Sequence, residues 1–156
     1  MNTTRTDLLR SLEGAREELV DVARSLTAEE LEVQVHEGGW NVWDVLAHVA
    51  ASEARLLDRA GKIVNGQATP DPNYNPTVST QSQVDERRGR TVEQLLAELR
   101  ASRADMVWTL DAMKDDQLGI QGCLASGKPI DVVGIIQRVA DHERGHTEEI
   151  RAAIER

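Results

Sequence analysis

Apolar side chains recur at three- and four-residue spacing in four long stretches of the chain, and each stretch predicts one face of an amphipathic helix. These stretches cover residues 8–26, 42–63, 92–113 and 132–150. Charged and polar residues fill the positions between the apolar ones, and no segment predicts a strand of comparable length. The pattern therefore predicts an all-α protein built from four long helices.

Residues with short polar side chains stand in front of three of the predicted helices. Asn41, Thr91 and Asp131 can each accept a hydrogen bond from a backbone N–H of the first turn that follows. Gln94 stands three residues after Thr91 and completes a capping box, while Asp44 places a carboxylate at the positive end of the second helix dipole. These caps predict where the three helices begin.

Residues 65–90 separate the second and third predicted helices and contain three prolines in "TPDPNYNP". They show no sustained period, so we expect a long crossover loop with a helical turn in its second half, of a length that is usually functional or disordered. A glycine-rich connection at 119–129 is expected to hold a short extended stretch. Four amphipathic helices and one long crossover predict a four-helix bundle, a single domain over residues 1–156, whose helix order the sequence leaves open.

The net charge of the chain limits the kinds of molecule that it is expected to bind. The chain has 27 acidic and 18 basic residues and a net charge of -9, which repels a phosphate backbone at long range. It has no Phe and four other aromatic residues, Trp40, Trp43, Tyr74 and Trp108, too few for a base-stacking platform. We therefore expect a small-molecule partner and no nucleic-acid partner.

Charges also interrupt every apolar run well short of the roughly 18 residues that a membrane span needs, so we expect no membrane segment. Cys123 is the only cysteine, which excludes a disulfide within the chain. The first ten residues lack the apolar core of a secretory signal. The expected location is a reducing cytoplasm.

Two histidines, His142 and His146, stand four residues apart in the fourth predicted helix. At about 100° per residue, His146 lies in line with Val132 and Val139, and His142 lies one turn earlier and somewhat to the side. Such a pair suits two positions around one metal ion. His48, at the edge of the second helix's apolar stripe, supplies a third imidazole if the two helices pack side by side. Three neutral imidazoles with a position left open have the layout of a catalytic site.

A structural interpretation of the same residues stays open, because His-x-x-x-His pairs arise by chance and each ring can be a packing residue. Zn²⁺ fits the ligand type, but imidazole also suits Ni²⁺, Fe²⁺ and Cu²⁺. Glu53, Glu143 and Glu149 can orient the imidazoles or act as a base, or they can be solvated helix charges. His36 has no partner at helical spacing, and we interpret it as a surface residue.

The stretches "GGWNVWDVLAHVAASEARLL" and "VADHERGHTEEIRAAI" resemble the DinB-like superfamily of four-helix bundles. Its members carry a Trp just before the second helix, a metal-ligand His within it and a His-x-x-x-His pair in the last helix. The resemblance covers residues 8–154 and implies that His48, His142 and His146 are the metal ligands, with Zn²⁺ or Ni²⁺ as the expected ion. Residues 73–103 resemble the branch that includes the colibactin self-resistance protein. One departure is "VAASE", which keeps only Glu53 where many members have an aromatic residue followed by Glu.

The superfamily contains S-transferases that use bacillithiol or mycothiol, so the resemblance implies a transferase with a low-molecular-weight thiol as co-substrate. A metal-coordinated thiol loses its proton and becomes a strong nucleophile. We interpret Cys123 as a packing residue, so the reacting sulfur would come from the co-substrate. Arg87 and Arg88, in "DERRGR", are the candidates for binding its acidic groups, although such a run can also be a solvated loop.

Two other functions remain open. The first is metal-dependent hydrolysis of a small molecule, with Glu53 or Glu143 as proton acceptor. The second is non-enzymatic sequestration of a small molecule, with Trp40, Trp43 and Tyr74 lining a cleft under the proline-containing crossover. A homodimer through the outer helix faces is compatible with the resemblance.

Overall fold

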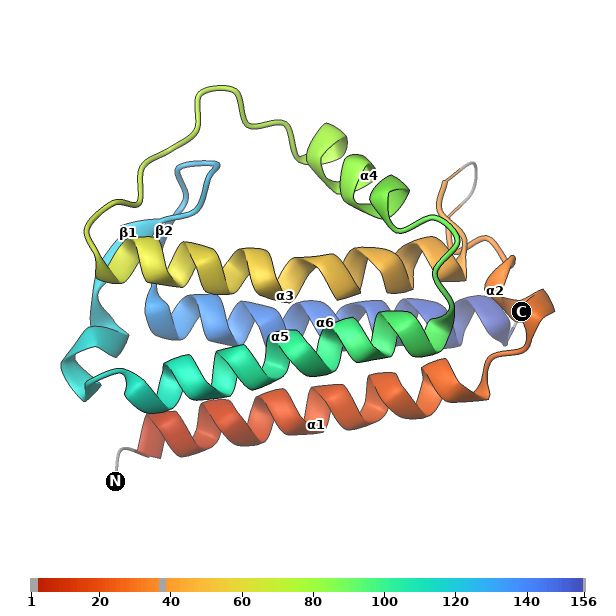
Figure 1. The fold of residues 1–156 in the computed structure, drawn as a ribbon, viewed down its shortest axis with the longest axis horizontal. Coiled ribbons are helices and arrows are strands. Elements are labelled where there is room, and N and C mark those ends of the chain that lie inside the picture. The colour runs from red at the N-terminus through yellow and green to blue at the C-terminus, as the bar shows by residue number, and fades with distance from the viewer. Residues whose placement is uncertain (1–2, 37–38, 156) are drawn as a thin grey trace.

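Four long helices form a bundle in the computed structural model, which describes residues 3–36 and 39–155 (Figure 1). They are α1 (Thr3–Ser25), α3 (Val42–Val64), α5 (Val92–Ala112) and α6 (Val132–Ile154). Each spans nearly the residues that the apolar period predicts. The predicted all-α four-helix bundle is confirmed.

The predicted helix caps are present as well. The Asn41 side chain accepts from the Asp44 backbone N–H at 2.9 Å, and the Asp44 carboxylate accepts from the Asn41 N–H at 3.0 Å. Thr91 and Gln94 make the same reciprocal pair at the start of α5. Asp131 accepts from the first turn of α6 at 2.7 Å. Between α1 and α3, the one-turn helix α2 (Ala28–Leu31) has a capping box of its own.

The helix order explains why the chain needs a long crossover. α1 packs against α5 and α6, and α3 also packs against α5 and α6, so α1 and α3 lie on one diagonal of the bundle. α3 and α5 run in the same direction, opposite to α1 and α6 (Figure 1). Since the 23 residues of α3 rise about 34 Å, the chain has to return over that length before α5 begins.

The crossover passes over α3 and carries a helix of its own, α4 (Pro76–Glu86) (Figure 1). Its 11 residues exceed the single helical turn that we expected. Asn75 caps its start by accepting from the Val78 N–H at 3.2 Å. Only Val84 of this helix is buried. One buried position makes no apolar stripe, which is why periodicity misses the helix.

The glycine-rich connection forms a 3₁₀ helix, η1 (Asp115–Gly119), and a short antiparallel hairpin of β1 (Gln121–Cys123) and β2 (Pro129–Asp131). Gly122 lies against the end of α3, where an added Cβ would stand 2.6 Å from Cγ1 of Ile63. The hairpin therefore depends on glycine for its close approach to the bundle.

The core consists of two apolar clusters, one toward each end of the bundle. One contains Leu19 and Ile150, and the other contains Leu12 and Ile136. Buried polar residues occupy the layer between them, among them Glu53, Glu143, Ser102 and Thr147. Among the described residues, no helix is both long enough and apolar enough to cross a membrane.

Candidate metal centre

Three imidazole rings meet between α3 and α6. Nε2 of His142 lies 2.8 Å from Nε2 of His48 and 3.0 Å from Nε2 of His146. The rings contact one another edge to face, with interplanar angles of 76° to 88°, so their nitrogens point toward a shared centre. One possible ligand atom from each of the three residues lies within 4.8 Å of the others. The side-by-side packing of the two helices thus brings the three predicted histidines together.

The environment of this cluster keeps two of its rings neutral. Burial lowers the pKa of His48 to about 4, and the charges of His146 and Arg55 act in the same direction. Burial also lowers the pKa of His142 to about 3, followed by the effects of the other two histidines, Arg138 and Arg55. A neutral imidazole keeps a free lone pair at neutral pH, and this lone pair is what a metal ion binds.

The donor set fits a divalent cation. At Zn–N bond lengths of 2.0–2.1 Å, tetrahedral geometry separates two ligand nitrogens by about 3.3 Å, a few tenths of an ångström more than the two contacts found. Nδ1 of His146 donates to the Glu149 carboxylate at 3.1 Å, which leaves the proton-free Nε2 for the ion. Metal-ligating histidines are commonly held by a carboxylate in this way.

Aromatic and polar neighbours surround the cluster. The Trp40 ring centroid lies 5.2 Å from that of His48, and Trp40 Nε1 donates to Gln81 of α4 at 2.9 Å. The side chain of His36 is 60% exposed, as expected of a surface residue, but its Nε2 lies 3.6 Å from the Glu149 carboxylate. We did not predict from the sequence that Gln81 and His36 lie near the histidine cluster. The contacts of Gln81 with Trp40 and of His36 with Glu149 join segments that are far apart in the chain.

A pocket of about 510 Å³ opens beside His48 and His142. Its walls come from α3, α6, the crossover with α4, and the tip of the β hairpin. Tyr74 lines this pocket, as expected for a cleft under the crossover, but Trp40 and Trp43, which were expected beside it, are not among the described lining residues. The volume lies in the range of small-molecule sites, and the histidines form part of its wall.

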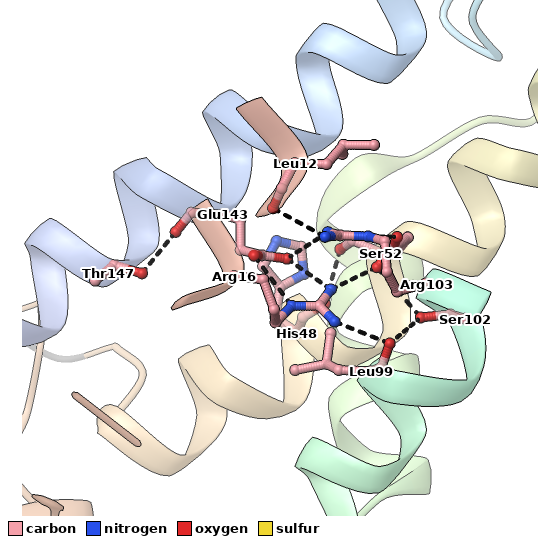
Figure 2. Close-up of polar contacts among 10 residues, drawn as sticks. Leu12, Arg16, His48, Ser52, Leu99, Ser102, Arg103, Glu143 and Thr147 are labelled. Carbon is pink, nitrogen blue, oxygen red and sulfur yellow. Dashed lines mark hydrogen bonds and ion pairs between the residues drawn. The ribbon is translucent and has the colours of Figure 1, made fainter. Parts of the chain in front are cut away.

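Glu53 and Glu143 belong to a buried ion-pair network with two arginines (Figure 2). Arg16 Nη2 lies 2.6 Å from Glu53 Oε2 and 2.9 Å from Glu143 Oε1. Arg103 Nε lies 2.7 Å from Glu53 Oε1, and its Nη2 lies 3.5 Å from Glu143 Oε1. Burial lowers the pKa of Arg16, but the two carboxylates outweigh burial and raise it. Two guanidinium and two carboxylate groups make the network electrically neutral.

The network adjoins the histidine cluster, since a small cavity is lined by His142 together with both glutamates. Sequence reasoning missed Arg16 and Arg103. A signal was available in α1, where Arg16 stands between Leu12 and Leu19 on the buried face. That Glu53 or Glu143 acts as a proton acceptor stays a prediction, and their oxygens are already bonded to arginine.

Arg87 and Arg88 lie at the end of α4 and pair with carboxylates. Arg87 Nε lies 3.0 Å from both Glu98 oxygens. Arg88 pairs with Asp44 and Asp85, and its guanidinium lies 5.1 Å from the Trp43 ring centroid. As far as the described residues show, neither arginine lines the pocket beside the histidines. Their role in binding a thiol stays a prediction.

Comparison with known proteins places the chain in a family. The model of the DinB superfamily matches residues 11–150. The chain therefore belongs to the DinB superfamily, which confirms the resemblance seen in the sequence. No curated protein matches it.

Three solved structures share the fold. YfiT from Bacillus subtilis matches with a TM-score of 0.82 at 18% identity, and the match covers 99% of this chain and 89% of YfiT. YfiT is described as a probable metal-dependent hydrolase with an unusual four-helix bundle topology. An uncharacterised protein from Escherichia coli UTI89 matches with a TM-score of 0.75 at 15% identity, covering 99% and 95% of the two chains. The colibactin self-resistance protein ClbS, solved in complex with a dsDNA, matches with a TM-score of 0.74 at 15% identity, covering 97% and 95%. At these identities the likeness shows the fold alone, so the absence of a nucleic-acid partner for this chain stays a prediction from its charge.

Proposed function

We propose that this protein is a metal-dependent enzyme that attacks a small molecule bound in the pocket beside His48 and His142. The observation that carries the proposal is the convergence of three Nε2 atoms at the wall of a pocket of about 510 Å³. The three imidazoles would hold a divalent ion, which would lower the pKa of a water or thiol bound to it. The deprotonated water or thiol would be a nucleophile at neutral pH.

The chain's own residues hold and shape this site. His48, His142 and His146 supply the ligand nitrogens, and Glu149 orients the His146 ring by accepting from its Nδ1. Trp40 covers one side of the His48 ring, and its bond to Gln81 ties α4 to that side. The crossover thus acts as a cover that limits the access of bulk water to the site.

Hydrolysis of a small molecule is the first candidate reaction. The support is the three-imidazole donor set and the shared fold with YfiT, a probable metal-dependent hydrolase. Metal coordination alone can bring the pKa of water to about 7, so this reaction does not require Glu53 or Glu143 as a base.

Transfer to a low-molecular-weight thiol is the second candidate. The observation that favours it is the engagement of both nearby carboxylates by Arg16 and Arg103. A thiol starts from a pKa of about 8.5, so it needs less help from a base than water does. The pocket also adjoins no cysteine nucleophile among its lining residues, so the sulfur would come from a co-substrate.

One experiment separates the two reactions from simple binding. The metal-loaded protein is incubated with a panel of carboxylic esters, amides, phosphoesters and alkyl or aryl halides, with and without bacillithiol or mycothiol, and the products are identified by mass spectrometry. Hydrolysis gives products without added thiol. Thiol transfer requires the thiol and gives a thioether and free halide from a halide, or a thioester and the released alcohol or amine from an ester or amide. The His146→Ala variant should lose either activity. Turnover that survives in this variant at unchanged rate contradicts both candidates.

A further inference from the structure

The pocket beside the histidines is basic, although the chain as a whole carries a net charge of -9. Apart from the histidines and Tyr74, the ionisable side chains found in its wall are four basic residues and one acidic residue, namely Arg55, Arg59, Lys62, Arg138 and Asp71. The local charge therefore runs against the overall charge. Such a reversal raises the local concentration of anions at the site.

Two of the four basic side chains already have structural partners. Arg59 Nε donates to the Cys123 carbonyl at 2.7 Å, and its Nη2 donates to the Thr69 carbonyl at 2.7 Å. These bonds attach the β hairpin and the crossover to α3. Lys62 lies 3.4 Å from the Asp58 carboxylate. Both residues are therefore occupied, because carbonyl oxygens take Nε and Nη2 of Arg59 and the Asp58 carboxylate pairs with Lys62.

Arg55 and Arg138 differ because, among the described residues, the side chain of neither one donates to a backbone carbonyl or pairs with a carboxylate. Arg55 Nη1 donates to the Ser79 hydroxyl of α4 at 3.3 Å. Over the described ranges, the exposed side chain of Arg138 makes no hydrogen bond or ion pair. Arginines elsewhere in the molecule commonly do pair with carboxylates, as Arg5, Arg24, Arg87, Arg88, Arg90 and Arg151 do.

Their positions in the helices aim both residues at the histidine cluster. Arg138 stands one helical turn before His142 in α6, and Arg55 stands two turns after His48 in α3. Both line the same pocket as these histidines.

We propose that Arg55 and Arg138 bind an oxyanion of the substrate, a carboxylate or a phosphate, and so place a neighbouring bond of that substrate at the histidine cluster. The inference deepens the proposed function and rests on it, because it assigns the pocket to the reacting molecule. A guanidinium binds either oxyanion through two parallel N–H bonds. The hydroxyls of Tyr74 and Ser126, which also line the pocket, can donate to further oxygens.

The proposal also predicts which substrates are excluded. Asp71 is the one carboxylate in the described wall of the pocket, and its Oδ1 accepts from the Asn73 N–H at 2.9 Å. A second anionic group that reached this side would be repelled. The pocket therefore favours a molecule with its anionic group at one end and a neutral remainder.

The test measures anion binding in the absence of metal. The chelator-treated full-length protein is titrated with inorganic phosphate and, separately, with acetate, at low ionic strength, and the dissociation constants are read from two-dimensional NMR. The variant is Arg55→Gln combined with Arg138→Gln. The matched control is Arg10→Gln combined with Arg100→Gln, which also removes two positive charges but from exposed residues outside this pocket. Circular dichroism confirms that each variant is folded.

We expect at least one of the two anions to bind, with affinity reduced about tenfold or more in the pocket variant and less than about twofold in the control, since charged hydrogen bonds are lost only in the pocket. Whichever anion binds more tightly identifies the chemical class of the substrate. Equal affinity in wild type and pocket variant, an equal loss in the control variant, or no binding of either anion overturns the proposal. Because no metal is present, failure here leaves the metal centre and the proposed function standing.

Discussion

Replacing Glu53 with glutamine probes the buried ion-pair network next to the candidate metal centre. The Glu53 side chain is 2% exposed, and its two oxygens accept from Arg103 Nε at 2.7 Å and Arg16 Nη2 at 2.6 Å. Ser102 Oγ donates to the same carboxylate at 3.3 Å. Glutamine is nearly isosteric, so the change removes the negative charge and one acceptor while leaving the packing.

The expected loss of stability follows from the charge that remains. The network is neutral in the wild type, and the Glu53→Gln variant leaves two guanidinium charges to share the single carboxylate of Glu143. Removing one member of a buried ion pair typically costs about 3–5 kcal/mol. That is a large fraction of the roughly 5–15 kcal/mol by which native proteins are stable. The NH₂ group of the glutamine would also face the N–H groups of Arg16 or Arg103, and this contact between donors increases the loss of stability.

Urea unfolding followed by tryptophan fluorescence and circular dichroism measures this loss. Glu93→Gln serves as the control, because Glu93 pairs with Arg24 at 3.4 Å and both side chains are more than half exposed. We expect the control to change the free energy of unfolding by less than about 0.5 kcal/mol. A second variant, Glu53→Gln with Arg103→Gln, removes one charge of each sign and should recover part of the loss.

The outcome also decides the role of this carboxylate. If the Glu53→Gln variant unfolds at the same urea concentration as the wild type, the ion pairs between Glu53 and the two arginines do not stabilise the fold. If the variant in addition keeps its metal but loses activity, Glu53 acts as the proton acceptor. A strong destabilisation that is partly restored in the double variant supports the structural role.

Other consequences can be checked directly. Glu149→Gln should weaken metal affinity about 10–100-fold with the fold intact, because it weakens the hydrogen bond that orients His146; an unchanged affinity by competition with a chelator would contradict this. Cys123→Ser should leave metal content and turnover unchanged, since Sγ packs 3.8 Å from a carbonyl oxygen of the crossover, and a loss of turnover would give the thiol a role. In the metal-free protein, the free energy of unfolding should fall as the pH drops from about 6.5 toward 4. Histidines of the unfolded chain take up protons near pH 6.5, whereas in the folded protein the pKa of His48 is about 4 and that of His142 is about 3. The same pH dependence in a His48→Gln, His142→Gln variant would show that other groups cause it.

Local patterns in the sequence were enough to predict the four long helices and the pairing of His142 with His146 on one helix face. An apolar stripe reports directly which face of a helix is buried, and caps such as Asn41 and Asp131 depend on residues three positions away. His142 and His146 share a face by spacing alone. Their meeting with His48 required the packing of α3 on α6, which the superfamily resemblance implied and the structure shows.

Features that depend on long-range partners could not be predicted in the same way. Arg16 and Arg103 look like ordinary charged positions until Glu53 and Glu143 from other helices meet them in the core. Arg138 is exposed, and its place in the wall of a pocket could not be predicted because that wall is completed by the crossover and the hairpin. The direction of α5 relative to α3 is set by the crossover, whose length permits more than one helix order.

Metal analysis of protein purified without a His-tag or added metal tests the central claim most directly. The comparison is a His142→Ala, His146→Ala double variant with an unchanged circular-dichroism spectrum. The convergence of three imidazoles predicts close to one divalent ion per chain in the wild type and its loss in the variant. A wild-type protein that holds no metal, even after incubation with Zn²⁺ or Ni²⁺, would contradict the metal centre and, with it, both proposed reactions.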